Sequence, residues 1–276
     1  MSFDVSHPEV LEAVRRALEE DIGTGDITTN LCVPAECPAV AQVIARERMV
    51  VAGIELLPLI LGPISGVLIH APSGYETERN TIIATIHGPA HTLLTTERTI
   101  LNFIQRLSAI ATLAHAYVQA VKGTKTRIQD TRKTTPGLRR LEKMAAAAGG
   151  VTNHRMGLYD AILIKNNHIA AAGGVRAALA ATEGASVPVE IEVRTREQLE
   201  EALECGAGHL LLDNLTPSQA REWIAYIDGH ATVELSGGIT LKNVRAYAEA
   251  GPDFISCGAI THSAQAMDIN LRLRLN

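Results

Sequence analysis

The sequence predicts an α/β protein in two unequal parts, of which the larger is a barrel-like parallel sheet with fewer than eight strands. Three observations support this prediction. After Thr124, six short apolar runs alternate with helical segments, which is typical of βα units. Between residues 39 and 88, short β-branched runs are separated by Pro and Gly, which predicts a small antiparallel sheet. With 46% hydrophobic but only 3% aromatic residues, the core must consist of Ala, Val, Ile and Leu, as in packed α/β layers.

The elements of the first part follow from local patterns. Residues 8–20 have apolar side chains at helical spacing and predict an amphipathic helix. Residues 20–29 combine Gly, Asp and Thr, which favours a turn with many side-chain-to-backbone bonds over a catalytic role. A short apolar helix is expected at 55–61. Residues 93–121 lack Gly and Pro and predict either one long helix or two helices joined near Ser108.

The second part is predicted from the spacing of its apolar runs. Polar or small residues end these runs at Arg132, Lys165, Glu192, Asp213, Ser236 and Gly258. The intervals are roughly 20 to 35 residues, enough for a strand, a helix and two loops. Six units are too few for a standard eightfold barrel, so the expected closure is incomplete or irregular. An open doubly wound sheet is the alternative, and it too would bind its ligand at the carboxyl ends of the strands.

Charge is distributed unevenly along the chain. The net charge is −5 and the pI about 6.1, which argues against a nucleic-acid binder that works through bulk electrostatics. Residues 127–168 nevertheless contain eight basic residues against three acidic ones. Such a local concentration predicts a pocket for a small, highly charged anion, because nucleic acid usually requires a broader basic surface.

The cysteines and the uncharged stretches bear on the compartment. Cys32, Cys37, Cys205 and Cys257 form neither a CxxC pair nor a metal-ligand pattern, and the N-terminal residues do not resemble a signal peptide. We therefore expect reduced thiols in a cytoplasmic protein. The longest uncharged run, 56–75, is interrupted by Pro and Gly, so neither a membrane span nor a membrane partner is expected.

A site is predicted where the strand ends converge. In a parallel sheet the carboxyl ends lie on one face, which here would gather Arg132, Lys133, Lys165, Glu192, Asp213, Ser236, Gly237, Gly238, Gly258 and His262. Carboxylates beside cations and Gly-rich turns suit a magnesium-bound phosphate or pyrophosphate, and helix starts at Thr240 and near Thr261 would add their positive ends. The alternative is that Glu192 and Asp213 are structural partners of Lys165 or Arg132.

A second group of residues points to a substrate with carboxylates. The basic side chains of this group are more numerous than a phosphate needs, and the planar arginine fork binds carboxylates bidentately. The group consists of Arg132, His154, Arg155 and Lys165. By itself His154 would more often be structural, but its neighbour Arg155 favours a substrate contact. Three further cations on the next helix are interpreted as partly solvated helix charges: Arg139, Arg140 and Lys143.

Arg98 is a candidate fifth member of this group. It shares a helical stripe with Leu94 and Leu101, and an arginine on an apolar stripe needs an anionic partner once it is buried. A surface salt bridge with Glu97 explains the sequence equally well.

Eight segments, spread in order over nearly the whole chain, form one pattern: EDIGTGDITT, TERTILNFIQRLSAIAT, DTRKTTPGLRRLEK, NHRMGLYDAILIKNNHI, EIEV, LLLDN, ELSGGI and ISCGAITHS. Together they resemble the quinolinate phosphoribosyltransferases, the carboxylating nicotinate-nucleotide pyrophosphorylases of NAD biosynthesis. The resemblance implies an N-terminal open-faced α/β sandwich over residues 1–110, to which the tail 264–276 returns, and an irregular α/β barrel over 111–263. It also implies a homodimer, or a larger assembly of dimers, with shared active sites.

The resemblance also implies roles for individual residues. The residues implied for quinolinate are Arg98, given across the dimer, Arg132, His154, Arg155 and Lys165. Those implied for phosphoribosyl pyrophosphate are Lys133, Lys165, Glu192, Asp213, Ser236, Gly237, Gly258 and His262. Of these, Lys133, Lys165, Glu192 and Asp213 would be catalytic, and Glu192 and Asp213 would hold Mg²⁺ directly or through the pyrophosphate. Val151 and Ala109 stand where the family often has glycine, which affects local loop geometry.

The implied reaction joins the ring nitrogen of quinolinate to C1 of the ribose, displaces pyrophosphate and releases the 2-carboxylate as carbon dioxide, giving nicotinate mononucleotide. No residue must act as a general acid or base, so positioning and electrostatics would dominate. The alternatives are a paralogous phosphoribosyltransferase acting on another acid and a non-catalytic anion-binding protein. A plain anion site would gain nothing from Glu192 and Asp213.

Overall fold

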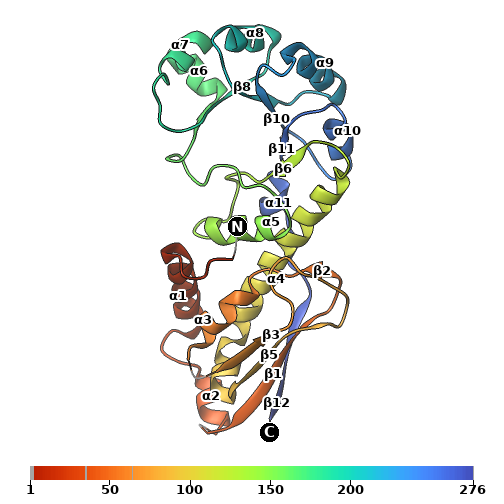
Figure 1. The fold of residues 1–276 in the computed structure, drawn as a ribbon. Helices are drawn as coiled ribbons and strands as arrows, with labels where there is room; N and C mark the ends of the chain where they lie inside the picture. The colour runs from red at the N-terminus through yellow and green to blue at the C-terminus, as the bar shows by residue number, and fades with distance from the viewer. Residues whose placement is uncertain (1–2, 35, 64, 276) are drawn as a thin grey trace. The chain divides into compact units, whose positions relative to one another are not determined.

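The computed structural model describes residues 3–34, 36–63 and 65–275, and the chain forms two compact units. The first unit comprises Met1–His115, Thr134–Gly150 and Ile260–Asn276, and the second comprises Ala116–Lys133 and Val151–Ala259. Each unit has its own sheet, and these sheets are described separately below (Figure 1).

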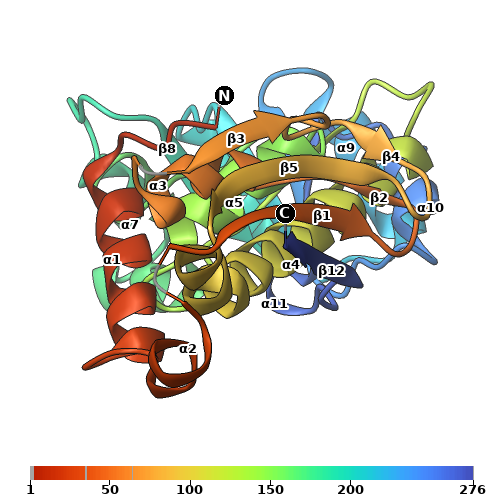
Figure 2. The ribbon, with the colours of Figure 1, turned by 90° about the horizontal axis from the view of Figure 1, so that it is seen from below.

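The first unit contains a four-stranded antiparallel sheet. Its strand order is β12 (Ile269–Leu275), β1 (Pro38–Ala45), β5 (Ile82–Pro89) and β3 (Gly66–Ile69), and Figure 2 shows these strands side by side. β1 alternates buried and less buried residues because one face of the sheet packs on helices. A separate short ladder joins β2 (Met49–Val50) to β4 (Glu76–Thr77). The predicted small antiparallel sheet is confirmed, with one added strand from the far end of the sequence.

The first helices begin where the sequence supplies caps. Helix α1 (Pro8–Ile22) starts at a proline and stops at Gly23, close to the prediction. The predicted turn at 20–29 is only partly correct, because α2 (Ile27–Cys32) already begins inside it. Asp26 caps α2 by accepting the Thr29 amide at 2.9 Å. The predicted helix at 55–61 is a 3₁₀ turn (Ile54–Leu56) followed by α3 (Leu57–Leu61).

A single long helix, α4 (Ala90–Ala120), confirms the first of the two alternatives predicted for this region. Ser108 lies within this helix and does not interrupt it. Its buried hydroxyl accepts a hydrogen bond from the Ala52 amide at 3.0 Å. The end of α5 (Arg139–Ala148) packs very closely on α4. A Cβ at Gly149 would lie 2.3 Å from the Ala111 carbonyl oxygen, so only glycine fits there.

The helix α5 also corrects one interpretation. Arg139 and Arg140 are half-buried, in line with partly solvated helix charges, but Lys143 is fully buried. Lys143 therefore belongs to the interior of the first unit. The sequence pattern did not reveal this because neighbouring cations recur at ordinary helical spacing.

The second unit contains six parallel strands. Their order is β6 (Arg127–Gln129), β11 (Phe254–Ser256), β10 (Thr232–Ser236), β9 (His209–Asp213), β8 (Val189–Val193) and β7 (Ile162–Ile164). From β7 to β11 the strands follow one another in chain order without the reversal of a doubly wound sheet. Among the described residues, β6 and β7 are not paired with each other. The irregular barrel with fewer than eight strands is thus confirmed, and the doubly wound alternative is wrong.

Helices follow the strands as βα units require, and Figure 1 shows several of them along the outer side of the sheet. They are α6 (Asn166–Ala172), α7 (Val175–Ala180), α8 (Arg196–Glu204), α9 (Pro217–Ile227), α10 (Val244–Ala248) and α11 (Ala259–His262). The helix start expected near Thr261 is confirmed, because α11 begins at Ala259, whereas the start expected at Thr240 is displaced to Val244 in α10. Within the described ranges, no helix combines the length and the apolar character that crossing a membrane requires.

Candidate active site

A cavity of about 610 Å³ lies in the second unit, at the carboxyl ends of its strands. Strand polarity explains the convergence, because parallel strands end on the same face. The predicted site residues that line the cavity are Arg132, Lys133, His154, Arg155, Lys165, Glu192, Asp213, Ser236, Gly237 and Gly238. Residues from six separate segments of the sequence therefore share one cavity.

Three predicted residues are placed elsewhere. Gly258 follows β11 in the second unit and does not line the cavity. Arg98 and His262 belong to the first unit. Arg98 is exposed on α4, although Leu101 on the same stripe is buried, and no ion pair joins it to Glu97 in the part of the chain that the structure describes. The salt-bridge alternative for Arg98 is therefore not observed.

Glu192 and Asp213, two of the three acids that line the cavity, are bridged by an arginine that sequence reasoning missed. One guanidinium nitrogen of Arg194, Nη2, lies 3.1 Å from Glu192 Oε1 and 2.7 Å from Asp213 Oδ2. Burial, with a smaller contribution from Asp213, raises the pKa of the Glu192 carboxyl. Among the described residues, the ion-pair partner of Glu192 and Asp213 is Arg194, not the Lys165 or Arg132 of the structural alternative. Arg194 follows Glu192 by two residues, so strand alternation could have placed both at the same edge.

The geometry of this pair fits a divalent cation. A single nitrogen lies within 3.1 Å of both carboxylates, which means that their oxygens face a common point. Carboxylate oxygens are the hard ligands that Mg²⁺ prefers. Asn166 Nδ2 donates to Glu192 Oε1 at 2.8 Å and thereby orients that carboxylate.

The SGG turn forms another wall of the cavity. Ser236 ends β10, and Gly237 and Gly238 follow with φ of +97° and +62°. A Cβ at Gly237 would lie 2.3 Å from Asn214 Oδ1 and 2.7 Å from the Asn214 amide nitrogen, so a side chain is excluded. This turn brings bare backbone to the cavity surface, as a phosphate-binding loop requires.

Two arginines form the cationic part of the cavity. Burial, together with the nearby charge of Arg132, lowers the pKa of Arg155. Arg155 Nη1 donates to the Ala161 carbonyl at 2.9 Å, which holds the side chain in place. An anion with two carboxylates would stabilise the charge of Arg155, which burial and the neighbouring Arg132 disfavour.

His154 lies on a cluster of acids that sequence reasoning did not identify. Its Nε2 is 3.2 Å from Glu190 Oε2 and 3.4 Å from Glu234 Oε2, and Glu234 is almost fully buried. The ligand atoms of these three residues lie within 4.8 Å of one another, a set that could bind a metal ion. The observed separations are those of hydrogen bonds, so a shared proton accounts for the arrangement.

The charge state of His154 follows from its neighbours. Burial alone would lower the pKa of His154, but hydrogen bonds and charge from Glu190 and Glu234 outweigh burial and raise it to about 10. The Arg155 amide, 2.7 Å from Nδ1, suits a neutral ring instead. We favour the charged ring, because hydrogen bonds to charged groups contribute about 1.5–3 kcal/mol and a neutral bond about 1 kcal/mol.

We expect the His154 ring to stay protonated at pH 8. Its folded pKa lies above the ordinary value of 6.5, so the resulting stabilisation is complete below pH 6.5 and is lost as the pH rises through about 10. A ¹⁵N NMR titration of the imidazole signals, assigned with a His154→Gln variant, measures this. The Glu190→Gln/Glu234→Gln variant should lower the midpoint, and a wild-type midpoint below pH 7 would contradict the charged cluster.

Another missed residue orients the segment that carries His154. Asp130 follows β6 and is fully buried. Its carboxylate accepts the His154 amide at 2.8 Å and Asn153 Nδ2 at 2.7 Å. A buried acid directly after a strand is the sequence signal that could have indicated this role.

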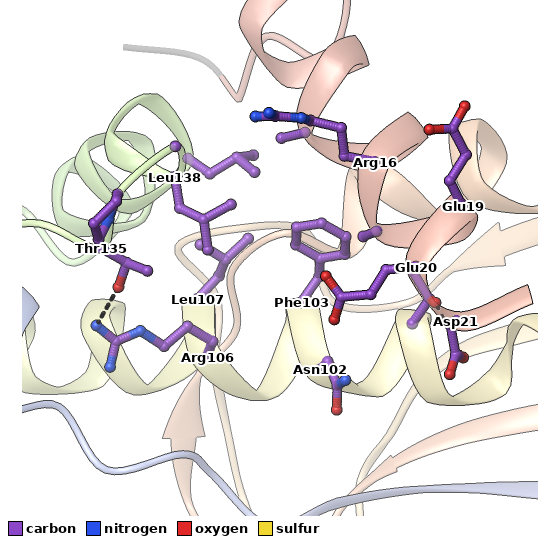
Figure 3. Close-up of a pocket in the computed structure, with 16 residues that line it drawn as sticks. Arg16, Glu19, Glu20, Asp21, Asn102, Phe103, Arg106, Leu107, Thr135 and Leu138 are labelled. Carbon is purple, nitrogen blue, oxygen red and sulfur yellow. Dashed lines mark hydrogen bonds between the residues drawn. The ribbon is translucent and has the colours of Figure 1, made fainter. Parts of the chain in front are cut away.

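A larger cavity, about 980 Å³, lies in the first unit. Figure 3 shows acidic side chains of α1, among them Glu20 and Asp21, on one side and Arg106 of α4 on another. It contains none of the predicted site residues. Volume alone therefore does not locate the chemistry, and the smaller cavity at the strand ends is the better candidate.

Comparison with known proteins gives one consistent result. Residues 26–108 and 110–272 match the family models for the N-terminal and C-terminal domains of quinolinate phosphoribosyl transferase. The chain is 41% identical to the nicotinate-nucleotide pyrophosphorylase [carboxylating] of Mycobacterium leprae, over 99% of this chain and 100% of that protein. It is 38% identical to the probable enzyme of that name from Bacillus subtilis, over 99% of this chain and 96% of that protein. The crystal structure of nicotinate-nucleotide pyrophosphorylase from Ehrlichia chaffeensis superposes with a TM-score of 0.92 at 38% identity, covering 95% of this chain and 98% of that one.

Proposed function

The chain belongs to the quinolinate phosphoribosyltransferase family, and we propose that it transfers the phosphoribosyl group of phosphoribosyl pyrophosphate to quinolinate with decarboxylation. The products are nicotinate mononucleotide, pyrophosphate and carbon dioxide, a step of NAD biosynthesis. The observation that carries this proposal is that one cavity is lined both by a cationic part, made of Arg132, His154 and Arg155, and by a second part, made of Glu192, Asp213 and the SGG turn.

The cationic part suits quinolinate, a ring with two adjacent carboxylates. Arg132 and Arg155 supply planar donors, and a charged His154 adds a third positive group. The other part suits the sugar phosphate: Lys133 and the SGG turn would bind phosphate oxygens, and Glu192 and Asp213 lie where a metal ion and the ribose would meet them. Lys165 lines the same cavity and would contact both substrates.

In the first step of the reaction one bond forms and another breaks, while the cavity holds both substrates in place. The ring nitrogen bonds to C1 of the ribose while the bond from C1 to the pyrophosphate oxygen breaks, and Lys133 and Lys165 offset the charge of the leaving group. Glu192 and Asp213 stabilise the positive character that develops on the ribose. Bound Mg²⁺, held by Glu192 and Asp213, would neutralise pyrophosphate charge.

Decarboxylation follows from the new charge on the ring. When the bond to the 2-carboxylate breaks, its electron pair stays at C2 beside the positive ring nitrogen, and a proton from water then occupies C2. Arg132 and Arg155 hold the ring so that this carboxylate leaves from a fixed position. The reaction needs no general base from the protein.

The complete enzyme in this proposal is a homodimer, in which Arg98 of each subunit reaches the quinolinate of the other. Its exposure on α4 supports this role, because an exposed guanidinium group is accessible to a substrate bound by another subunit. All four cysteines are free thiols, which favours a reducing compartment, and we place the enzyme in the cytoplasm.

The test follows carbon dioxide released from quinolinate labelled at the 2-carboxylate, in the presence of phosphoribosyl pyrophosphate and Mg²⁺. Release should depend on all three components and should equal the nicotinate mononucleotide formed. Turnover of nicotinate without release from quinolinate would instead identify a non-decarboxylating phosphoribosyltransferase. Binding of both compounds without turnover would identify an anion-binding protein.

Replacing Arg194 by methionine is expected to lower the Mg²⁺ concentration needed for half-maximal activity about fivefold. The guanidinium group is half-exposed and competes with the metal ion for Glu192 and Asp213. Such a pair contributes about 1 kcal/mol, which corresponds to about a fivefold change in affinity. The rate is measured against Mg²⁺ concentration at saturating substrates.

Arg196→Met is the matched control, because Arg196 pairs with Glu200 and stacks on Tyr226 away from the cavity. A higher Mg²⁺ requirement in Arg194→Met would show that Arg194 assists the metal ion and does not compete with it.

A further inference from the structure

We propose that Asp160 is a positioning residue that fixes Arg155 for a carboxylate of quinolinate. Asp160 is not among the described residues that line the candidate active site, so it would act through the loop that carries Arg155. This inference rests on the proposed function, because that function assigns Arg155 to quinolinate. Asp160 and Arg155 lie on one continuous segment of the second unit, residues 153–161.

This segment is a loop that regular backbone ladders do not fix. It lies between an isolated bridge at Thr152 and strand β7, and its residues form neither helix nor strand. The side chains at its tip do not anchor it either, because Leu158 and Tyr159 are 73% and 72% exposed. Hydrogen bonds to polar side chains therefore have to order this loop.

The Asp160 carboxylate closes the loop on itself. Its Oδ2 accepts the Met156 amide at 2.6 Å, and its Oδ1 accepts the Gly157 amide at 2.9 Å. Both oxygens are thus bonded to the two amides that directly follow Arg155 in the sequence. Hydrogen bonds to a charged acceptor are roughly twice as strong as neutral ones. The carboxylate therefore fixes the backbone on the carboxyl side of Arg155.

The Arg155 side chain depends on the same segment. Its Nη1 donates to the carbonyl of Ala161, the residue after Asp160, at 2.9 Å. On the amino side of Arg155, Asp130 accepts the His154 amide at 2.8 Å. The guanidinium group thus spans the segment that Asp160 closes, and a shift of that segment would move its acceptor. Loss of the Asp160 carboxylate should therefore displace the Arg155 side chain in the cavity.

The charge of Asp160 acts in the same direction. Burial, followed by the charge of Arg132, lowers the pKa of Arg155, whereas the charges of Asp160 and Glu190 raise it. The Asp160 carboxylate therefore offsets part of the cost of keeping Arg155 charged beside Arg132. An amide in its place would lose this effect together with at least one of the two hydrogen bonds.

The expected consequence concerns quinolinate and not phosphoribosyl pyrophosphate. Segment 153–161 carries His154 and Arg155, both assigned to quinolinate, and no residue assigned to phosphoribosyl pyrophosphate. Lys165, assigned to both substrates, lies beyond β7, which its pairing with β8 holds in place. Asp160→Asn should therefore raise the KM for quinolinate about tenfold, while the KM for phosphoribosyl pyrophosphate changes less than about threefold.

A double-mutant comparison tests whether Asp160 acts through Arg155. The affinity for quinolinate is measured by calorimetry, which needs no turnover. Asp160→Asn should weaken binding about tenfold in the wild-type background but less than about twofold in Arg155→Met, because the side chain that Asp160 positions is then already absent. A merely structural role would give the same factor in both backgrounds.

Asp253→Asn is the matched control. Asp253 also belongs to the second unit, and its Oδ2 accepts the Val233 amide at 2.9 Å. It directly precedes β11, however, and so lies at the amino end of the strands, opposite the candidate active site. Both KM values of this variant should stay within about twofold of wild type. Circular dichroism establishes the folding of each variant.

Hydrogen exchange in the wild-type protein is a measurement that needs no variant. The amides of Met156 and Gly157, bonded to Asp160, should exchange at least about tenfold more slowly than those of Leu158 and Tyr159 at the exposed tip. NMR resolves the individual amides. Equal rates would overturn the positioning role even if Asp160→Asn did not fold.

The outcomes separate the two proposals. A folded Asp160→Asn protein whose KM for quinolinate stays within about twofold of wild type would overturn the positioning role, and so would equal increases for the two substrates. An equal effect in the Arg155→Met background would overturn it as well. A wild-type chain that binds quinolinate but releases no carbon dioxide would overturn the proposed function alone, and the calorimetric affinities would then decide the role of Asp160. A wild-type chain that does not bind quinolinate would overturn both.

Discussion

Replacing Arg98 by alanine is expected to lower kcat/KM for quinolinate at least about 100-fold while the protein stays folded. Arg98 is exposed on α4, so its removal should not disturb the core of the first unit. In the proposed homodimer, however, it neutralises a carboxylate of quinolinate in the partner's site. Losing one member of such a charged pair costs about 2–5 kcal/mol, which is a rate effect of roughly 30-fold to several thousandfold.

A mixing experiment tests whether the site is shared. In a mixed dimer of Arg98→Ala and Arg132→Ala subunits, one site has both arginines intact and the other has neither. Because half of randomly exchanged dimers are mixed, a 1:1 mixture should recover about a quarter of the wild-type activity. Arg79→Ala, which alters another exposed arginine of the first unit, is the control and should behave as wild type. Near-normal activity of Arg98→Ala, or a mixture as inactive as its components, would contradict the shared site.

Replacing the carboxylates of Glu192 and Asp213 by amides, in a Glu192→Gln/Asp213→Asn variant, is expected to lower kcat at least about 1000-fold and to remove the response to Mg²⁺. The amides keep the volume of the acids but can neither bind the metal ion strongly nor stabilise positive charge on the ribose. Each effect is of the size that oxyanion or metal stabilisation contributes, several kcal/mol. Steady-state rates over a range of Mg²⁺ concentrations measure both.

The matched control for this variant is Glu200→Gln/Glu249→Gln. Those acids form exposed pairs with arginines on helices and should be dispensable. If the cavity variant retained activity that still rises with Mg²⁺, the metal ion would be held through the pyrophosphate alone. If it retained activity without any Mg²⁺ response in either protein, the metal proposal itself would be wrong.

The parallel sheet could be predicted well because buried strands leave a strong sequence signal. Each apolar run after Thr124 became one strand, and the convergence of strand ends placed ten predicted residues around one cavity. The helix 90–120 was also visible, since a long segment without Gly or Pro has few other options. The errors lie in short elements. At 20–29 a turn and a helix cap use the same residue types, so the start of α2 at Ile27 was not distinguishable.

The partners of charged residues were the least predictable part of the site. Glu192 and Asp213 were identified, but their pairing with Arg194 depends on where one flexible side chain reaches. His154 was expected at the substrate. Its contacts with Glu190 of β8 and Glu234 of β10 join three segments that are far apart in the sequence. Such pairs are set by tertiary packing, which composition and periodicity do not encode.

The pairing of β12 with β1 has a consequence for how the protein is made. β12 forms seven residue pairs along β1, from Ala39 with Leu275 to Ala45 with Ile269. On the ribosome, β1 emerges long before β12, with the whole parallel sheet of the second unit translated in between. Throughout that interval one edge of β1 lacks its partner, and an unpaired strand edge is a template for aggregation. The nascent chain is therefore most exposed to chaperones and to misassembly until translation has passed β12.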